Sequence, residues 1–451
     1  SILRSMGDRL EERVGPRAIA TVALVAAVVH GALLWLYWAP AAKLPWGDEH
    51  SYIASAARLL TGARDWMPEP LWPPLYPRFV AGASAAAGGS VLGVQLLQTL
   101  MLAVTAVVLA DLTRRVSGSA KAAIVAGGLA ATYPPLVAYA HFLWPEVLHL
   151  FLFISLLWIL VARWNRLAWL AVAGLLLGLA LLTKSLLAPF APILLGAGVL
   201  RRPASRIPLR LLVVVAATVV TVAPTAAARH RETGRWMIAD SSAFNLWVGL
   251  NDEGARNFEN DIVWLSYLEW RDSSPDFAER NRILWRRIGD ELRRRPVVET
   301  LRRQLGRQYF RLLDDDSYLT NQLPGGVAVR RWQEGYVEAP RAAAAAVRWL
   351  SWSMYAALLV SAPIGWVLWR QRERRWAWVL LSFAAYNLGL FFWLHATTRY
   401  RVQLLPILFI GAGCAVAWWA AGRPPRERWR TVAAVLIAGV LLVFAFGGAV
   451  V

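Results

Sequence analysis

The chain of 451 residues is 57% hydrophobic and 17% charged, with a mean hydropathy of +0.43. Since soluble domains average about 25% charged residues, this composition excludes an ordinary soluble enzyme. The net charge of +19 would suit a nucleic-acid-binding protein, but such proteins lack long uncharged runs, so we expect no nucleic-acid partner. An all-α polytopic membrane protein with arginine-rich loops explains both values. The single cysteine, Cys414, excludes a disulfide framework and a cysteine-based metal site.

Eleven segments are long and apolar enough to be membrane spans, which need about 20 mostly apolar residues. The regular ones are 17–38, 90–112, 146–162, 167–183, 376–394, 402–421 and 431–450. The less regular ones are 120–138, 185–200, 207–226 and 343–369, and the number of spans within 167–200 is the least defined. We interpret the first span as a retained helix because no cleavage-site pattern follows it.

The short loops on one side of the predicted membrane are all basic. They contain 21 Lys and Arg residues against six carboxylates, within 4–17, 111–121, 163–166, 201–210, 370–375 and 423–430. The positive-inside rule therefore predicts that this side and the N-terminus are cytoplasmic. With eleven spans, the C-terminus would then be outside.

Two long segments, 39–89 and 227–342, are predicted to lie on the extracytoplasmic side. The second contains 19 Arg and 18 Asp plus Glu, so it is close to neutral. Within it, 276–313 has helical apolar periodicity but too many arginines for a span. We predict amphipathic helices there that lie on the membrane surface or cover the first long loop. No separate soluble domain is indicated, so 1–451 is interpreted as one transmembrane domain.

Adjacent carboxylates follow the first span at Asp48 and Glu49. Asp48 is a candidate general base for an acceptor hydroxyl, because a carboxylate close to the reacting oxygen can take its proton. Glu49 is interpreted as a second catalytic carboxylate, as a partner of an arginine, or as a ligand with Asp48 of a possible divalent metal. The structural alternative is that Asp48 caps a helix from Glu49 to Leu60. No spacing of candidate ligand residues in the sequence requires a cofactor.

Further polar residues occur in the other loops of the same side. Glu146 follows Pro145 at a predicted helix start. Its negative charge either stabilises the positive end of the helix dipole or adds a second acidic group to a cavity beside Asp48. The side chains proposed to line this acceptor or sugar cavity are Tyr52, Tyr76, His141, Glu146, Asn245 and Asn251. The structural alternative is that the two asparagines form turns. Trp247, which lies between them, would then be a packed side chain.

Three cations are unusual because they lie on the side where the positive-inside rule does not place them. Lys184 interrupts an apolar stretch, and Arg399 and Arg401 flank Tyr400 at the start of a span. Charged groups at this depth usually have partners, and arginines can bind a phosphate through two nitrogens. We predict that Lys184, Arg399, Tyr400 and Arg401 bind a lipid phosphate. The alternatives are snorkelling to the interface and pairing with lipid headgroups or Glu49.

Taken in order, these motifs resemble the GT-C membrane glycosyltransferases, in particular the family-39-like protein O-mannosyltransferases and lipid A aminoarabinose transferases. The resemblance rests on Asp48-Glu49 with Tyr52, Pro73-Pro-Leu-Tyr-Pro77, Pro145-Glu146, Phe244-Asn-Leu-Trp with Gly249 and Asn251, and Arg399-Tyr-Arg401 with Pro406. It implies a GT-C-type fold in the bacterial cytoplasmic (inner) membrane. Two expected features differ from the larger members, namely the number of about eleven spans and the lack of a soluble domain after the last span. In addition, Leu250 stands where the first of two asparagines after Gly249 is expected.

The resemblance implies that one sugar is transferred, with inversion, from a polyprenyl-phosphate-linked donor to an acceptor hydroxyl on a cell-envelope glycan, lipid or protein. In that family the first acidic residue, here Asp48, is the base, and basic residues at the position of Arg399 and Arg401 bind the donor phosphate. Outside the cytoplasm no nucleotide sugars are available, which agrees with a lipid-linked donor, and membrane lipids are expected partners.

Three other functions are compatible with the sequence. A flippase or transporter of lipid-linked sugars would have charges near the bilayer midplane and broken helices there. An oligosaccharide ligase or polymerase would use a diphosphate donor and a basic extracytoplasmic loop. A membrane scaffold would leave the polar motifs without a chemical role.

Overall fold

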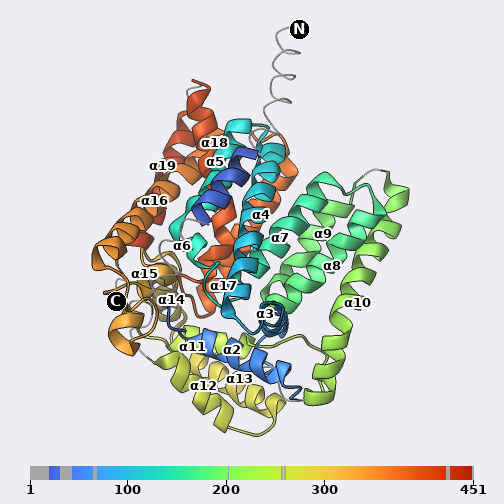
Figure 1. Ribbon diagram of the computed structural model, residues 1–451, viewed down its shortest axis with the longest axis vertical. Coiled ribbons are helices and arrows are strands. Elements are labelled where there is room, and N and C mark those ends of the chain that lie inside the picture. Colours follow the sequence, from blue (N-terminus) through green and yellow to red (C-terminus); the bar gives the residue numbers. More distant parts are fainter. Residues whose placement is uncertain are drawn as a thin grey trace.

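The computed structural model describes residues 20–30, 43–63, 69–201, 203–254, 257, 261–422 and 427–448. Within this part the chain is built from helices, and the one isolated β-bridge joins Leu44 to Gly335. Long helices run side by side through the molecule, and shorter helices gather at one end of them (Figure 1). We call the long helices the bundle and refer to the end with the short helices as the capped end.

Six helices of the described part are long and apolar enough to cross a membrane. Their segments are α4 (Val91–Ser117), η3 with α10 (Ala204–Thr233), α16 (Arg341–Leu368), α17 (Arg374–Trp393), η5 with α18 (Tyr400–Ala420) and α19 (Arg428–Phe446). Five shorter apolar helical segments are Ala20–His30, α5 (Ala120–Thr132), α7 (Glu146–Ala162), α8 (Leu167–Thr183) and η2 with α9 (Ser185–Val199). The prediction of an all-α polytopic membrane protein is therefore confirmed, while the number of eleven spans stays a prediction.

Local chemistry explains several helix ends. Ser90 and Ser119 precede α4 and α5, and each side-chain oxygen accepts a backbone N–H of the first turn. Gly118 ends α4 with φ 76°, a left-handed conformation that suits glycine. The predicted span 120–138 divides in two, because α5 ends at Thr132 and the pair Pro134-Pro135 starts the short helix α6 (Pro134–Ala138).

Small residues bring neighbouring bundle helices close together. A Cβ at Gly365 of α16 would lie 1.8 Å from the Gly411 carbonyl oxygen of α18, and a Cβ at Gly413 of α18 would lie 2.3 Å from that of Ala122 in α5. Since lipid tails are as apolar as leucine, bundle helices associate through such close packing and not through burial of apolar surface. These contacts hold α5, α16 and α18 together around the most buried span.

The capped end consists of parts of the two long loops. The first loop contributes α2 (Asp48–Leu60) and α3 (Leu75–Ala86). The large loop contributes α11 (Ser242–Asn251), α12 (Ile262–Asp272), α13 (Phe277–Arg294), α14 (Val297–Leu313), α15 (Tyr318–Gln322) and η4 (Ala328–Trp332). A small hydrophobic core joins α11, α12 and α13, and Leu71 of the first loop belongs to it. The two loops therefore pack as one cap, with α2 beside the helices of the large loop (Figure 1).

The predicted helix boundaries need one correction. The helix after the first span begins at Asp48, and Gly47, with φ 59°, is its N-cap, so the structural alternative of Asp48 as the N-cap is wrong. Glycine suits this position because it adopts a positive φ without the strain that a Cβ would cause. Asp48 instead occupies the first turn, where its charge complements the helix dipole.

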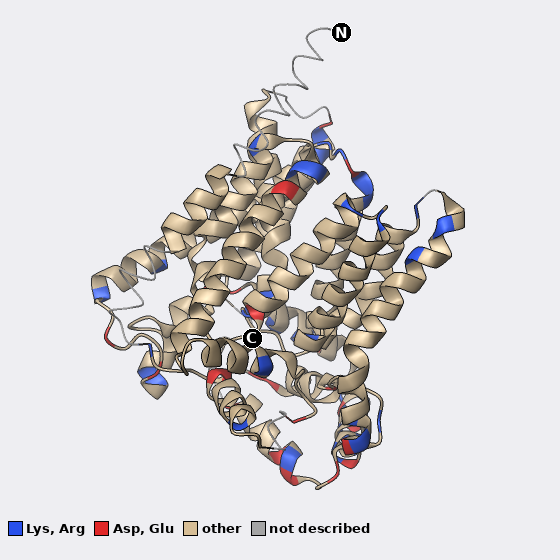
Figure 2. Ribbon diagram, turned by 45° about the vertical axis from the view of Figure 1, so that its right-hand side comes forward, with Lys and Arg blue, Asp and Glu red and all other residues tan. Residues whose placement is uncertain are grey.

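Charge differs between the two ends of the bundle. Basic segments dominate the end away from the cap, whereas Lys, Arg, Asp and Glu are mixed at the capped end (Figure 2). This distribution is the one expected from basic cytoplasmic loops and a near-neutral extracytoplasmic loop. The orientation in the membrane remains a prediction that labelling can test.

We predict opposite accessibility for two introduced cysteines in a Cys414→Ser background. Asn165 lies in an exposed loop at the uncapped end and Pro275 in an exposed loop of the cap. A membrane-impermeant maleimide applied to intact spheroplasts should label Pro275→Cys, and should label Asn165→Cys only after permeabilisation. The reverse labelling pattern would show that the topology is opposite to the predicted one.

Candidate active site

A buried carboxylate at the capped end of the bundle gathers two cations. Glu146 is the first residue of α7, and its side chain is 0% exposed. Its Oε1 accepts from Lys184 Nζ at 2.8 Å and from Arg399 Nε at 2.5 Å. Lys184 lies in the extended link between α8 and η2, and Arg399 lies in the turn just before η5 (Tyr400–Leu404). Three segments that are distant in the sequence therefore converge on one carboxyl group.

Arg399 extends this cluster to the first loop. Its Nη1 donates to Asp48 Oδ2 at 2.5 Å, so the guanidinium bridges the carboxylates of Asp48 and Glu146. The Asp48 side chain is 48% exposed, whereas Arg399 is 11% exposed. Burial opposes the charge of Arg399, but Glu146 and Asp48 hold its pKa well above the ordinary value. Asp48 is thus the solvent-facing member of a buried ion-pair cluster.

Aromatic side chains enclose the cluster. The Arg399 guanidinium lies over the Trp144 ring at 4.7 Å from its centroid, and Lys184 lies over Tyr400 at 5.8 Å. Trp144 packs edge-on against Tyr318 of α15 with ring centroids 4.3 Å apart. Tyr52 contacts Tyr76 in the same manner at 4.9 Å. These rings exclude water from the cations, which strengthens electrostatic interactions within the cluster.

Glu49 has a different environment from its neighbour Asp48. It is buried, and its carboxylate accepts the backbone N–H groups of Trp46 at 2.8 Å and Leu143 at 2.7 Å and pairs with Lys43. This carboxylate therefore ties the first loop to the turn before α7. Asp48 and Glu49 therefore pair with different cations, Arg399 and Lys43. Among the described residues, no group of three or more His, Cys, Asp or Glu side chains is placed to bind a metal ion.

Arg401 has different partners from those of Arg399. It is buried, and its guanidinium donates to the main-chain carbonyls of Asp314 and Asp316, the latter at 3.0 Å, and lies over the Tyr355 ring at 4.2 Å. These contacts fix the segment after α14 to the start of α18. They use the same donors that a phosphate would need. Tyr400 between the two arginines stacks on Phe391, with ring centroids 4.7 Å apart.

Tyr76 and His141 belong to a buried network next to the cluster. The Tyr76 hydroxyl donates to Gln98 Oε1 at 2.9 Å, and Gln98 Nε2 donates to the carbonyls of Ala140 and Phe142. The carbonyl of His141 accepts from Gln95 Nε2 at 3.0 Å. Burial lowers the pKa of His141 to about 3, so this imidazole is neutral at physiological pH. The network holds the turn that leads to Trp144 and Glu146.

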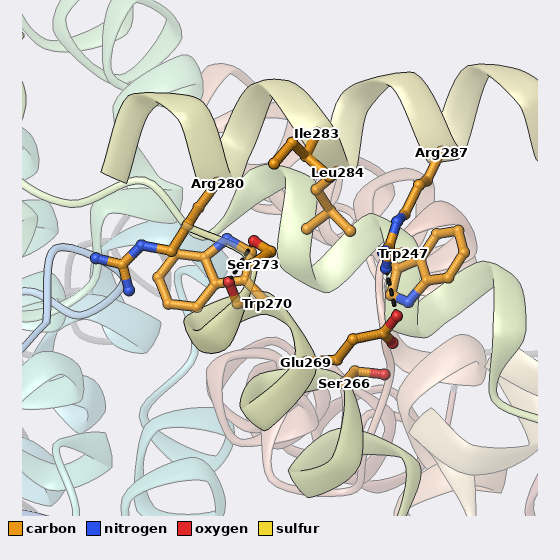
Figure 3. A pocket seen from close by; sticks show the side chains of 9 residues that line it. All are labelled: Trp247, Ser266, Glu269, Trp270, Ser273, Arg280, Ile283, Leu284 and Arg287. Carbon is orange, nitrogen blue, oxygen red and sulfur yellow. Dashed lines mark hydrogen bonds and ion pairs between the residues drawn. The ribbon is translucent and has the colours of Figure 1, made fainter. Parts of the chain in front are cut away.

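The two asparagines of α11 bond within their own helix. Asn245 Nδ2 donates to the Ser241 carbonyl at 3.0 Å and Asn251 Nδ2 to the Trp247 carbonyl at 2.9 Å. Trp247 borders a small pocket between α11, α12 and α13, beside the ion pair of Arg287 and Glu269 (Figure 3). This pocket leaves room for about one water molecule. The asparagines thus join the support of the site and not its charged centre.

α11 supports the site through the segment that leads to Arg399. The Asn245 carbonyl accepts from His395 N–H at 2.8 Å. Gln308 of α14 donates to the Gly249 carbonyl at 2.7 Å and accepts from Ala396 N–H at 3.0 Å. A Cβ at Gly249 would lie 2.5 Å from the Trp393 carbonyl oxygen, so only glycine allows this approach. The large loop therefore fixes the turn that carries Arg399.

Sequence reasoning missed several participants, of which Trp144, Tyr318 and Lys43 are the clearest. Trp144 directly precedes the Pro145-Glu146 motif, and Lys43 is one of the three lysines of the chain. These two sequence features could have indicated that Trp144 and Lys43 lie near the site. Tyr318 had none, because it reaches the cluster only through the fold of the large loop.

The fold and this charged cluster define a polytopic membrane protein with a capped, buried ion-pair site at one end of its bundle. Residues 72–227 match the family model of the dolichyl-phosphate-mannose-protein mannosyltransferases. The matched part contains Tyr76, His141, Glu146 and Lys184, and leaves Asp48 and Arg399 outside. This match confirms, over the matched residues, the resemblance to GT-C membrane glycosyltransferases that the sequence motifs indicate.

Solved structures provide weaker similarities. The oligosaccharyltransferase of Archaeoglobus fulgidus, tethered to an acceptor peptide, has a TM-score of 0.49 at 15% identity and covers 96% of this chain and 54% of its own. ArnT from Cupriavidus metallidurans, bound to undecaprenyl phosphate, has a TM-score of 0.40 at 14% identity. The match covers 89% of this chain and 77% of ArnT. The chain thus spans about half the length of the archaeal enzyme. No curated protein matches the sequence significantly.

We predict that Gly249→Ala destabilises the protein by about 1–3 kcal/mol, the usual cost of forcing atoms into a packed contact. The reason is the clash with the backbone around Trp393. Gly289 in α13 is the matched control, because a Cβ there would have only Arg293 Nη2, at 3.9 Å, within contact distance. Gly289→Ala should stabilise the helix by about 1 kcal/mol. Thermal unfolding in detergent measures both, and equal midpoints would refute the contact.

We also predict that Glu49→Gln lowers stability by about 1–3 kcal/mol, since an amide cannot satisfy all the buried donors around this carboxylate. Glu299→Gln is the control, because Glu299 is exposed in the first turn of α14. Thermal unfolding of the two purified variants should therefore separate them. An unchanged midpoint for Glu49→Gln would show that the carboxylate does not hold the two loops together.

Proposed function

We propose that this protein transfers a single sugar, with inversion, from a polyprenyl-phosphate-linked donor to an acceptor hydroxyl at the extracytoplasmic face of the membrane. The observation that carries the proposal is the half-exposed carboxylate of Asp48 directly beside Arg399, which with Lys184 forms a shielded cationic centre around Glu146. A base and an anion-binding centre next to each other are what such a transfer needs. The family match over 72–227 supports the reaction class.

In the proposed reaction Asp48 takes the proton of the acceptor hydroxyl. The acceptor oxygen attacks the anomeric carbon of the donor sugar, and the bond between that carbon and the phosphate oxygen breaks. The electron pair of that bond leaves with the polyprenyl phosphate, which becomes a monoester. Arg399 and Lys184 stabilise the charge that develops on this leaving group. The proton ends on Asp48, and attack opposite the phosphate inverts the anomeric configuration.

In this proposal the predicted site residues have different roles. Asp48 is the proposed base, and Arg399 and Lys184 the proposed phosphate ligands. Glu146 positions both cations. Glu49 and Arg401 are positioning residues, because their donors and acceptors are engaged with main-chain groups of neighbouring loops.

Two alternative functions receive less support. A flippase would need charges near the bilayer midplane, but Asp48 and Glu146 start helices and Lys184 follows the end of one. A ligase with a diphosphate donor would need cations for two phosphates, and Arg401 is engaged with backbone carbonyls. A monophosphate-linked donor suits the two cations of the centre better.

We predict that Asp48→Asn reduces sugar transfer by about 10²- to 10⁴-fold, the usual cost of removing a positioned base, and leaves the fold intact. The assay follows transfer of labelled sugar from undecaprenyl-phosphate-mannose or undecaprenyl-phosphate-glucose to native cell-envelope acceptors. Asp290→Asn, an exposed substitution in α13, is the control and should retain wild-type activity. A purified Asp48→Asn protein that turns over at the wild-type rate would exclude this mechanism.

A further inference from the structure

A narrow recess lies directly beside the ion-pair cluster. It is lined by Glu146, His149, Leu150, Lys184, Val402 and Gln403. His149 follows Glu146 by three residues on α7, which places both on one face of the helix. Gln403 comes from η5, just after Arg399. Glu146 is shared, since its Oε1 holds the two cations and the residue also lines the recess.

Three buried polar atoms at this recess have no hydrogen-bond partner in the described part of the chain. They are Glu146 Oε2, His149 Nε2 and Gln403 Nε2, on residues that are 2%, 2% and 8% exposed. An unsatisfied buried polar atom costs about 1–3 kcal/mol, so three of them around one space indicate a ligand that supplies the missing partners.

The chemistry of the three atoms indicates hydroxyl groups. A carboxylate oxygen accepts a hydrogen bond, an amide nitrogen donates one, and the neutral imidazole nitrogen does either. A sugar hydroxyl both donates and accepts, so it can satisfy all three. A phosphate oxygen only accepts and would face Glu146 Oε2 without a proton between them, which disfavours the phosphate itself in this recess.

We propose that the recess binds the sugar of the lipid-linked donor, with Glu146 Oε2, His149 and Gln403 as ligands of its hydroxyls. This assignment rests on the proposed function, in which Arg399 and Lys184 hold the adjacent phosphate. Phosphate and sugar are neighbours in the donor, as the cationic centre and the recess are in the protein. The recess is too tight for a water molecule in this conformation, so binding includes rotation of the Lys184 or Gln403 side chain.

The test compares two lipids, undecaprenyl phosphate and undecaprenyl-phosphate-mannose, for binding to purified protein in detergent without acceptor. Gln403→Leu and His149→Phe replace the two ligands by apolar side chains of similar size. Each variant should bind the mannose-bearing lipid at least tenfold more weakly than the wild type and bind undecaprenyl phosphate within twofold of it. Lys184→Ala should weaken the binding of both lipids. Gln371→Ala, near Cys414, is the control and should change neither.

Four results would overturn the assignment. Equal losses for both lipids in Gln403→Leu and His149→Phe would make these residues phosphate ligands. Unchanged binding of both lipids with an increased KM for the acceptor would assign the recess to the acceptor. A wild type that binds both lipids equally would exclude a sugar subsite. A wild type that binds neither lipid would instead refute the proposed function, and the sugar subsite with it.

Discussion

The pairing of the buried Glu146 carboxylate with Arg399 and Lys184 is the interaction on which the rest of the site depends. A carboxylate without a partner at this depth would cost several kcal/mol in desolvation. Because one oxygen accepts from both cations, the carboxylate fixes the start of α7, the link after α8 and the turn before η5 in a single arrangement. Arg399 Nη1 donates to Asp48, so the arrangement extends to the first loop.

The cap turns this pairing into a defined geometry. The turn of Arg399 is anchored from the large loop, where Gln308 and the close approach at Gly249 hold residues 393–396. On the other side, Glu49 binds the backbone of Leu143 and thereby fixes the turn that ends at Glu146. Two independent loops therefore position the two residues that meet in the ion pair. The large loop, which is nearly neutral and contributes little to the net charge, thus serves mainly as this support.

Much of the fold follows from local sequence, whereas the partners at the site do not. Spans, the helix start at Glu146 and the break between α13 and α14 at Arg295-Pro296 depend on apolar runs and on proline, which are visible locally. Residues of like charge that are close in sequence, however, have different interaction partners in the structure. Successive residues of an α-helix point about 100° apart, so Asp48 meets Arg399 while Glu49 turns inward to Lys43 and two backbone N–H groups. Arg399 and Arg401 are separated in the same way by the 3₁₀ turn, and their hydrogen-bond partners lie 85 or more residues away in sequence.

The pairing of Asp48 with Arg399 also has a consequence for the proposed chemistry. Two cations face two carboxylates in the cluster, so its net charge is zero before the donor binds. A phosphodiester donor adds one negative charge. During transfer Asp48 gains a proton and loses its charge, while the departing phosphate monoester gains one. The total charge of the site is therefore constant, and negative charge moves from Asp48 to the phosphate past the guanidinium that both can contact. A site arranged in this way needs little reorganisation as the reaction proceeds, which is the property that makes a buried cation effective in catalysis.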